Sequence, residues 1–333
     1  MQSVRKYALV VAAVAGLAGA TAPASADVAL KFGWATTDSA TDSYNFTAHA
    51  FADALQAAKP NYFKVSFFPN RQLGDERDML QGLQLGTVDT ALITNSVIAN
   101  VDPAFTINDL PFLYPSSQAA FKVLDGKPGQ GLLERLKKRR VVGLAWCDSG
   151  FRNMVNRVRP INSVEDIKGL KVRVIESPLF VRMFQLLDAA GVPMPFGEVF
   201  SALQQGTIDG MENPTWSIAS SRFDEVTKYL SITRHIYSAI PILMSAKLYD
   251  SMSAEDQKIV TQAAATACAK QRKFNADAET KIIEGMAAKG IKVNEVKDMD
   301  AFRKKMDPLF AEYRTKIGPD VFDGWIDSVA KAK

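Results

Sequence analysis

Residues 82–90 read GLQLGTVDT, and residues 202–210 read ALQQGTIDG. Five of the nine positions are identical, and Val88 corresponds to Ile208. The apolar residues upstream of both copies have the spacing of one helix face. The glycine in each copy follows them at the position where a residue in the left-handed conformation commonly ends a helix. The pattern predicts a helix that leads into a strand. Its two copies, 120 residues apart, predict two similar α/β lobes with a cleft between them.

The first 26 residues have the pattern of a secretory signal peptide. A basic pair at 5–6 precedes an apolar run at 8–20, and Ala-Ser-Ala at 24–26 forms a cleavage signal. The run is short and rich in alanine and glycine for a membrane span, so an uncleaved anchor is the less favoured alternative. We expect a chain that is exported to the periplasm and released, beginning at Asp27.

The mature chain would have 307 residues, enough for two domains with substantial cores. It carries 38 basic and 36 acidic side chains, a balance that argues against nucleic acid or an anionic membrane as a partner. The basic run at 137–140 is explained more simply as the last turn of a helix, where cations favour the helix dipole.

Two cysteines remain in an oxidising compartment, Cys147 and Cys268. They could form one disulfide. A chain of this size does not need a cross-link, however, and Cys268 lies in an alanine-rich helical stretch where a small buried residue fits. We therefore expect two free thiols.

Strands alternate with helices along the whole chain, which predicts α/β lobes with mostly parallel sheets. The expected strands are 30–34, 64–68, 90–93, 141–147, 171–174 and 291–296. The expected helices are 45–58, 116–125, 129–138, 178–190, 253–290, 299–315 and 319–331. The helix at 253–290 would approach about 50 Å in length, enough to lie across both lobes.

The chain changes character at Asp148-Ser149-Gly150, which we take as the boundary between the lobes. Lobe I is expected to contain residues 27–150 with about 238–270. Lobe II is expected to contain residues 151–237 with about 271–333.

The sequence lacks the patterns of common catalytic sites. It has two histidines, His49 and His235, with no HExxH motif and no Cys/His cluster, so we expect no metal site. No nucleophile elbow and no glycine-rich phosphate loop occur either, so we expect no cofactor. Carboxylates are numerous, and a hydrolase with a carboxylate pair remains the enzymatic alternative.

Unusual polar residues gather between 150 and 216. Arg173 stands between Val172 and Val174, and a guanidinium at such a buried position requires an anion. Its planar fork matches a carboxylate. The anion could be a ligand, or it could be an internal salt-bridge partner such as Glu176 or Asp209.

Two further residues follow the second copy of the repeated motif. Asn213 lies at an expected strand end, where ligands collect in open α/β sheets, although an asparagine before Pro214 can also cap a turn. Trp216 could stack on a ligand or line the surface between the lobes.

The motifs of this region occur together in one known family. They are Gly-Phe-Arg at 150–152, Lys-Gly-Leu-Lys-Val-Arg-Val at 168–174, Gly-Val-Pro-Met-Pro-Phe at 191–196, the stretch 198–210 and Glu-Asn-Pro at 212–214. Gln-Leu-Gly at 72–74, Asp-Leu-Pro-Phe-Leu at 109–113 and the stretches 225–229 and 233–235 agree as well. The chain resembles the extracytoplasmic substrate-binding proteins of tripartite ATP-independent periplasmic (TRAP) transporters, DctP type.

The resemblance implies a two-lobed periplasmic-binding-protein-like fold of the α/β class, with a hinge and a long helix spanning both lobes. It implies that Arg173 holds a ligand carboxylate, that Arg152 supports it and that Asn213 fixes the same carboxylate. Phe196 corresponds to an aromatic residue under the ligand. In lobe I the expected specificity contacts are Glu76 or Arg77, and Asn95; Trp34 and Trp216 are expected wall residues. The stretch 38–44 departs from the family pattern.

The implied function is high-affinity periplasmic binding of a small organic acid anion by lobe closure. The anion would be a sugar acid, hydroxy acid or keto acid, passed to the small and large membrane subunits of a TRAP permease without ATP hydrolysis. We expect a monomer that is not an enzyme. The alternatives are a secreted carboxylate-dependent hydrolase and a periplasmic sensor that presents its ligand to a receptor.

Overall fold

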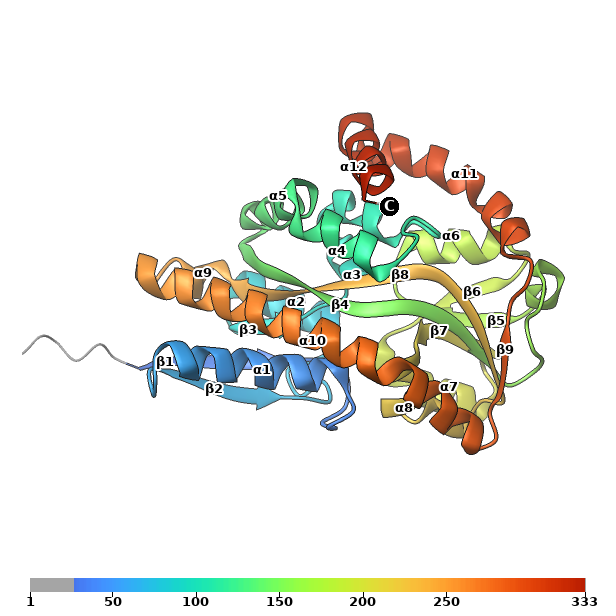
Figure 1. Ribbon diagram of the computed structural model, residues 1–333, viewed down its shortest axis with the longest axis horizontal. Helices are drawn as coiled ribbons and strands as arrows, with labels where there is room; N and C mark the ends of the chain where they lie inside the picture. The colour runs from blue at the N-terminus through green and yellow to red at the C-terminus, as the bar shows by residue number, and fades with distance from the viewer. Residues whose placement is uncertain (1–26, 333) are drawn as a thin grey trace, which may run out of the picture.

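Nine strands form one continuous mixed sheet in the computed structural model, which describes residues 27–332 (Figure 1). The strand order is β2-β1-β3-β8-β4-β7-β5-β6, with β9 paired to β8. The strands are β1 Val28–Gly33, β2 Phe63–Phe68, β3 Thr90–Leu92, β4 Val141–Asn156, β5 Lys171–Val174, β6 Ala190–Pro193, β7 Gly210–Pro214, β8 Tyr229–Ser245 and β9 Lys292–Glu295. We use lobe I for the end of the sheet with β1–β3 and lobe II for the end with β5–β7.

Helices cover both ends of this sheet (Figure 1). They are α1 Ser43–Ala58, α2 Glu76–Leu85, α3 Asn95–Ile98, α4 Ser117–Asp125, α5 Lys127–Arg135, α6 Pro178–Leu186, α7 Val199–Gln205, α8 Thr215–Ser220, α9 Ala246–Tyr249, α10 Ala254–Ala288, α11 Met299–Ile317 and α12 Pro319–Lys331. None of the helices in residues 27–332 has the length and apolar composition to cross a membrane. The expected signal peptide at 1–26 lies outside the described residues.

The repeated motif forms the same structure in both lobes. Helices α2 and α7 end at Gly86 and Gly206, whose φ angles of 76° and 74° require the left-handed region that glycine adopts at low cost. Asp89 and Asp209 then accept hydrogen bonds from backbone N–H groups of β1 and β5, at 2.9 and 2.8 Å. Each copy therefore attaches a helix end to its sheet, and the predicted helix-to-strand step is confirmed.

Two long antiparallel strands connect the lobes. Within each lobe the strands are parallel, but β8 runs antiparallel to β3 and β4, and β4 runs antiparallel to β7. Strand β4 continues through the expected boundary at 148–150, where its register with β8 shifts and Gly150 has a φ of 90°. Strand β8 is absent from the sequence prediction, and the expected helix at 178–190 ends at Leu186 because residues 190–193 form β6.

The long helix α10 lies across both lobes, as expected (Figure 1). The Ser253 hydroxyl caps it by accepting a hydrogen bond from the Asp256 N–H. The expectation of two free thiols is wrong, because Cys147 of β4 and Cys268 of α10 form a disulfide. The small buried residues of α10 let the helix approach β4 closely, so the two Cα atoms are 4.5 Å apart.

Candidate functional site

A small cavity lies between the two lobes, close to the carboxyl ends of β1, β3, β5 and β7. It is lined by Ala35, Thr36, Tyr44, Glu76, Thr94, Arg152, Arg173, Ile175, Phe196, Asn213, Trp216 and Ser217. Its volume of about 30 Å³ holds only a few water molecules. This space is narrow because the lobes touch each other along its rim.

Polar side chains make these contacts between the lobes. The Ser220 hydroxyl of lobe II donates to Asp42 of lobe I at 3.0 Å. Arg77 of lobe I forms an ion pair with Glu176 of lobe II, with 3.4 Å between Nη1 and Oε1. Asp42 is buried, so its hydrogen bond is shielded from water, whereas the Arg77–Glu176 ion pair is partly exposed and contributes little free energy.

Arg173 is buried in the cavity wall without a carboxylate partner. It belongs to β5, and its Nε and Nη2 donate to the Met194 carbonyl at 3.0 and 2.7 Å. No carboxylate of residues 27–332 lies within ion-pair distance of it: Asp209 accepts from a backbone N–H, and Glu176 pairs with Arg77. Burial lowers the pKa of Arg173 to about 10, so the group is still a cation at neutral pH.

Arg152 is also buried, but its charge is balanced. Its guanidinium donates to both carboxylate oxygens of Glu212, with 2.8 Å between Nη2 and Oε1, and also to the Glu212 carbonyl. His235 Nε2 lies 3.3 Å from the same carboxylate. Burial raises the pKa of Glu212, but Arg152 and His235 outweigh this effect and hold that pKa below its usual range. The excess positive charge of this wall therefore belongs to Arg173.

Three other expected residues of lobe II line the cavity. The Asn213 amide donates to Ser217 Oγ at 2.8 Å, which fixes its orientation. The ring centre of Phe196 is 5.9 Å from the guanidinium carbon of Arg173. The indole of Trp216 packs on Tyr44, with 4.8 Å between ring centres, and its N–H donates to a backbone carbonyl of β4.

Glu76 faces this group from lobe I. Its Oε1 accepts hydrogen bonds from the backbone N–H and the hydroxyl of Thr94, at 2.8 and 2.6 Å. Burial raises the pKa of Glu76 above its usual range, and the hydrogen bonds from Thr94 and the charge of Arg173 offset only part of this rise. The cavity thus has a cation on one wall and a hydrogen-bond acceptor on the other.

Three expected residues do not line the cavity. Asn95 is fully buried, and its amide donates to the Phe105 carbonyl at 2.9 Å. Trp34 packs in the core of lobe I, and its indole N–H donates to the Thr37 carbonyl at 3.4 Å. Arg77 lies on the rim.

Sequence reasoning missed six residues of the lining: Ala35, Thr36, Tyr44, Thr94, Ile175 and Ser217. Thr94 lies just beyond the carboxyl end of β3, and Thr36 lies just beyond that of β1. The same rule that selected Asn213 would have found both threonines.

The sequence and the structure both match known solute-binding proteins. Residues 34–316 match the DctP family, bacterial extracellular solute-binding protein, family 7. The chain is 35% identical over 311 residues to the 2,3-diketo-L-gulonate-binding periplasmic protein YiaO of Escherichia coli, covering 93% of both chains.

Two crystal structures have the same fold. The sugar acid binding protein DctPAm of Advenella mimigardefordensis, in complex with galactonate, superposes with a TM-score of 0.90 at 32% identity, covering 92% of this chain and 99% of the other. A TRAP periplasmic solute-binding protein from Polaromonas sp. JS666, bound to D-erythronate, has a TM-score of 0.87 at 36% identity, covering 90% and 98%. The chain belongs to family 7 of the bacterial extracellular solute-binding proteins, the DctP family of TRAP transporters.

Proposed function

We propose that this chain binds a monocarboxylate sugar acid between its lobes in the periplasm and delivers it to the two membrane subunits of a TRAP permease. The observation that carries the proposal is Arg173, a buried cation that lines the cavity and has no carboxylate partner in residues 27–332. A ligand carboxylate would complete this site. The ligands named for the relatives above, galactonate, D-erythronate and 2,3-diketo-L-gulonate, are all monocarboxylates with several oxygen substituents.

The geometry supports a ligand that lies between Arg173 and Glu76. In this arrangement the carboxylate binds the free N–H groups of Arg173 and the Asn213 amide, over the ring of Phe196. Glu76 accepts hydrogen bonds from ligand hydroxyls. A second carboxylate at the far end of the ligand would meet Glu76, so the site favours a monocarboxylate over a dicarboxylate.

The lining does not favour the hydrolase alternative. A carboxylate-pair mechanism needs an acid and a base that both face the substrate. Glu76 is the one carboxylate among the residues of the cavity wall, and the nearby Glu212 is held by Arg152 behind that wall. We infer that the protein binds and releases its ligand unchanged, as an exported monomer from which residues 1–26 have been removed.

A thermal-shift comparison of three related compounds tests this function. The protein is unfolded, freed of small molecules and refolded, and then melted with galactonate, with the neutral polyol galactitol and with the dicarboxylate galactarate. At 100 times its dissociation constant a ligand adds about 2.7 kcal/mol to stability, which is readily detected. We expect the largest shift with galactonate. An equal shift with galactitol would refute recognition through a carboxylate, and a larger shift with galactarate would refute the role of Glu76.

A further inference from the structure

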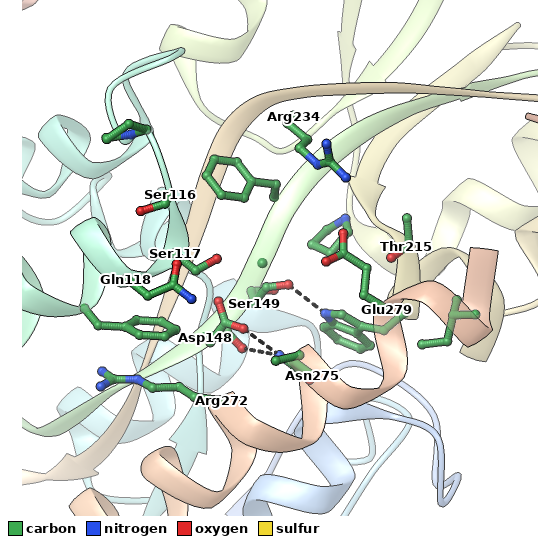
Figure 2. A pocket seen from close by; sticks show the side chains of 18 residues that line it. Ser116, Ser117, Gln118, Asp148, Ser149, Thr215, Arg234, Arg272, Asn275 and Glu279 are labelled. Atoms are coloured by element: carbon green, nitrogen blue, oxygen red, sulfur yellow. Dashed lines mark hydrogen bonds between the residues drawn. The ribbon is translucent and has the colours of Figure 1, made fainter. Parts of the chain in front are cut away.

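A second, larger cavity opens beside the strands that connect the lobes (Figure 2). It has a volume of about 400 Å³, and we call it the rear groove. Its lining residues come from four places: the start of α4 (Ser117, Gln118), one side of α10 (Ala276, Glu279), the connecting strands β4 and β8 (Phe151, Arg234) and the start of α8 in lobe II (Thr215, Trp216).

The rear groove and the ligand cavity lie on opposite sides of β4. Successive side chains of a strand point to opposite faces. Arg152 points into the ligand cavity, while the preceding residue, Phe151, lines the rear groove and packs on Tyr237, with 5.4 Å between ring centres. Trp216 lines both spaces, so its indole is part of the partition between them.

The two walls of the rear groove belong to different lobes. Helix α4 packs with α5 against the part of β4 nearest lobe I, whereas Thr215 and Trp216 start α8 of lobe II. Several side-chain hydrogen bonds hold the lining in place. Arg272 of α10 donates to Asp125 at the end of α4, at 2.6 Å. Asn275 donates to Asp148, and Trp216 donates to Ser149, both on β4 (Figure 2). No hydrogen bond or ion pair of the described residues joins α4 directly to Thr215 or Arg234.

The position of β4 makes the widths of the two spaces interdependent. When two rigid bodies turn about strands that lie between two spaces, the space on one side narrows as the other widens. The ligand cavity is narrow in this structure, and the rear groove is wide. Opening the lobes for ligand entry would therefore bring α4 and the lobe II wall toward each other.

We propose that the rear groove controls lobe closure, because any group that fills it obstructs the open form and holds the protein closed. This inference rests on lobe closure as part of the proposed function. If only a fraction of the ligand-free protein is closed, apparent affinity is reduced by that fraction, and filling the groove restores the lost affinity. With about one molecule in ten closed, the largest gain is about tenfold.

A large side chain placed in the groove serves as the probe. Ala276→Trp adds bulk from α10, and Gln118→Trp adds it from α4; both positions are exposed and line the groove. Lys281→Trp is the matched control, because it places the same side chain on an exposed position of α10 outside the groove lining. Spin labels at Gln81 on α2 and Gln204 on α7 report the distance between the lobes by double electron–electron resonance, while the native cysteines stay paired.

We expect both groove variants, without ligand, to show the label distance that wild-type protein reaches with ligand. Their affinity for galactonate by calorimetry should rise about threefold to tenfold. The Lys281→Trp protein should match the wild type in both measurements. Unchanged distances, wider lobes or weaker binding in both groove variants would overturn the proposal. If the label distances shift but galactonate binds no variant, the groove proposal stands and the proposed ligand is wrong.

Discussion

Replacing Arg173 with lysine keeps a positive charge in the cavity but removes the planar fork. Arginine has five N–H donors, and two of them are used on the Met194 carbonyl, so three remain for a ligand. A lysine ammonium must choose between that carbonyl and the ligand. Losing one charge-assisted hydrogen bond costs about 1.5–3 kcal/mol, so we expect Arg173→Lys to weaken ligand binding by about 10- to 100-fold.

Arg173→Ala removes the charge as well. The ligand carboxylate would then be buried without a partner, at a cost of about 3–5 kcal/mol, or about 100- to 5,000-fold in affinity. The fold should change little, because the side chain of Arg173 makes hydrogen bonds only to the Met194 carbonyl, and one such bond contributes about 1 kcal/mol.

Isothermal titration calorimetry with galactonate, paired with urea unfolding of each variant, makes the comparison. Arg182→Lys is the control, since Arg182 is also in lobe II but pairs with Glu312 outside the cavity, at 2.8 Å. Its affinity should equal that of the wild type. If Arg173→Lys binds galactonate as tightly as the wild type, the argument from an unpartnered buried guanidinium fails.

Three other variants test the surroundings of the site. Arg152→Ala should cost about 3–5 kcal/mol of folding stability, because Glu212 is left charged and buried; urea unfolding measures this, and a loss below about 1 kcal/mol would contradict the structural role of the pair. Replacing both Cys147 and Cys268 by alanine should lower stability by about 2–5 kcal/mol while ligand affinity stays unchanged, and an unaltered melting temperature would argue against the cross-link. Burial raises the pKa of Asp109 to about 7, against about 4 in the unfolded chain, so between these values the folded state holds a proton that the unfolded state releases, and stability should fall as pH rises from 4 through 7. Asp109→Asn should flatten that fall in urea unfolding at pH 5 and pH 8, and an unchanged slope would mean that Asp109 does not titrate there.

Local patterns predicted the parts of the fold that local interactions determine. The glycine caps at Gly86 and Gly206 and the start of α10 depend on a few neighbouring residues, and all three lie where the sequence placed them. Strand β8 was missed because its partners are remote in the sequence. The pairing of Cys147 with Cys268 was missed for the same reason, since it depends on how α10 crosses β4.

The same limit applies to the candidate site. Arg173 could be identified from the sequence because a guanidinium between two apolar strand residues is buried and needs an anion. Asn95 and Trp34 looked equally suited to a cavity wall, yet their polar atoms bind nearby carbonyls inside lobe I. Residue type and spacing do not show whether a polar side chain faces the ligand cavity or forms its hydrogen bonds inside the lobe.

The late position of β8 in the chain has a consequence for biogenesis. Strand β3 pairs with β8, for example Thr90 with Met244, and β8 also pairs with β4. The β3 edge of the lobe I sheet therefore has no neighbouring strand until about residue 245 has been synthesised. Pairings this distant in sequence form slowly. If the chain is exported as proposed, slow completion of its first lobe keeps it unfolded for longer, and an unfolded chain is what a narrow export channel admits before Cys147 and Cys268 pair on the oxidising side.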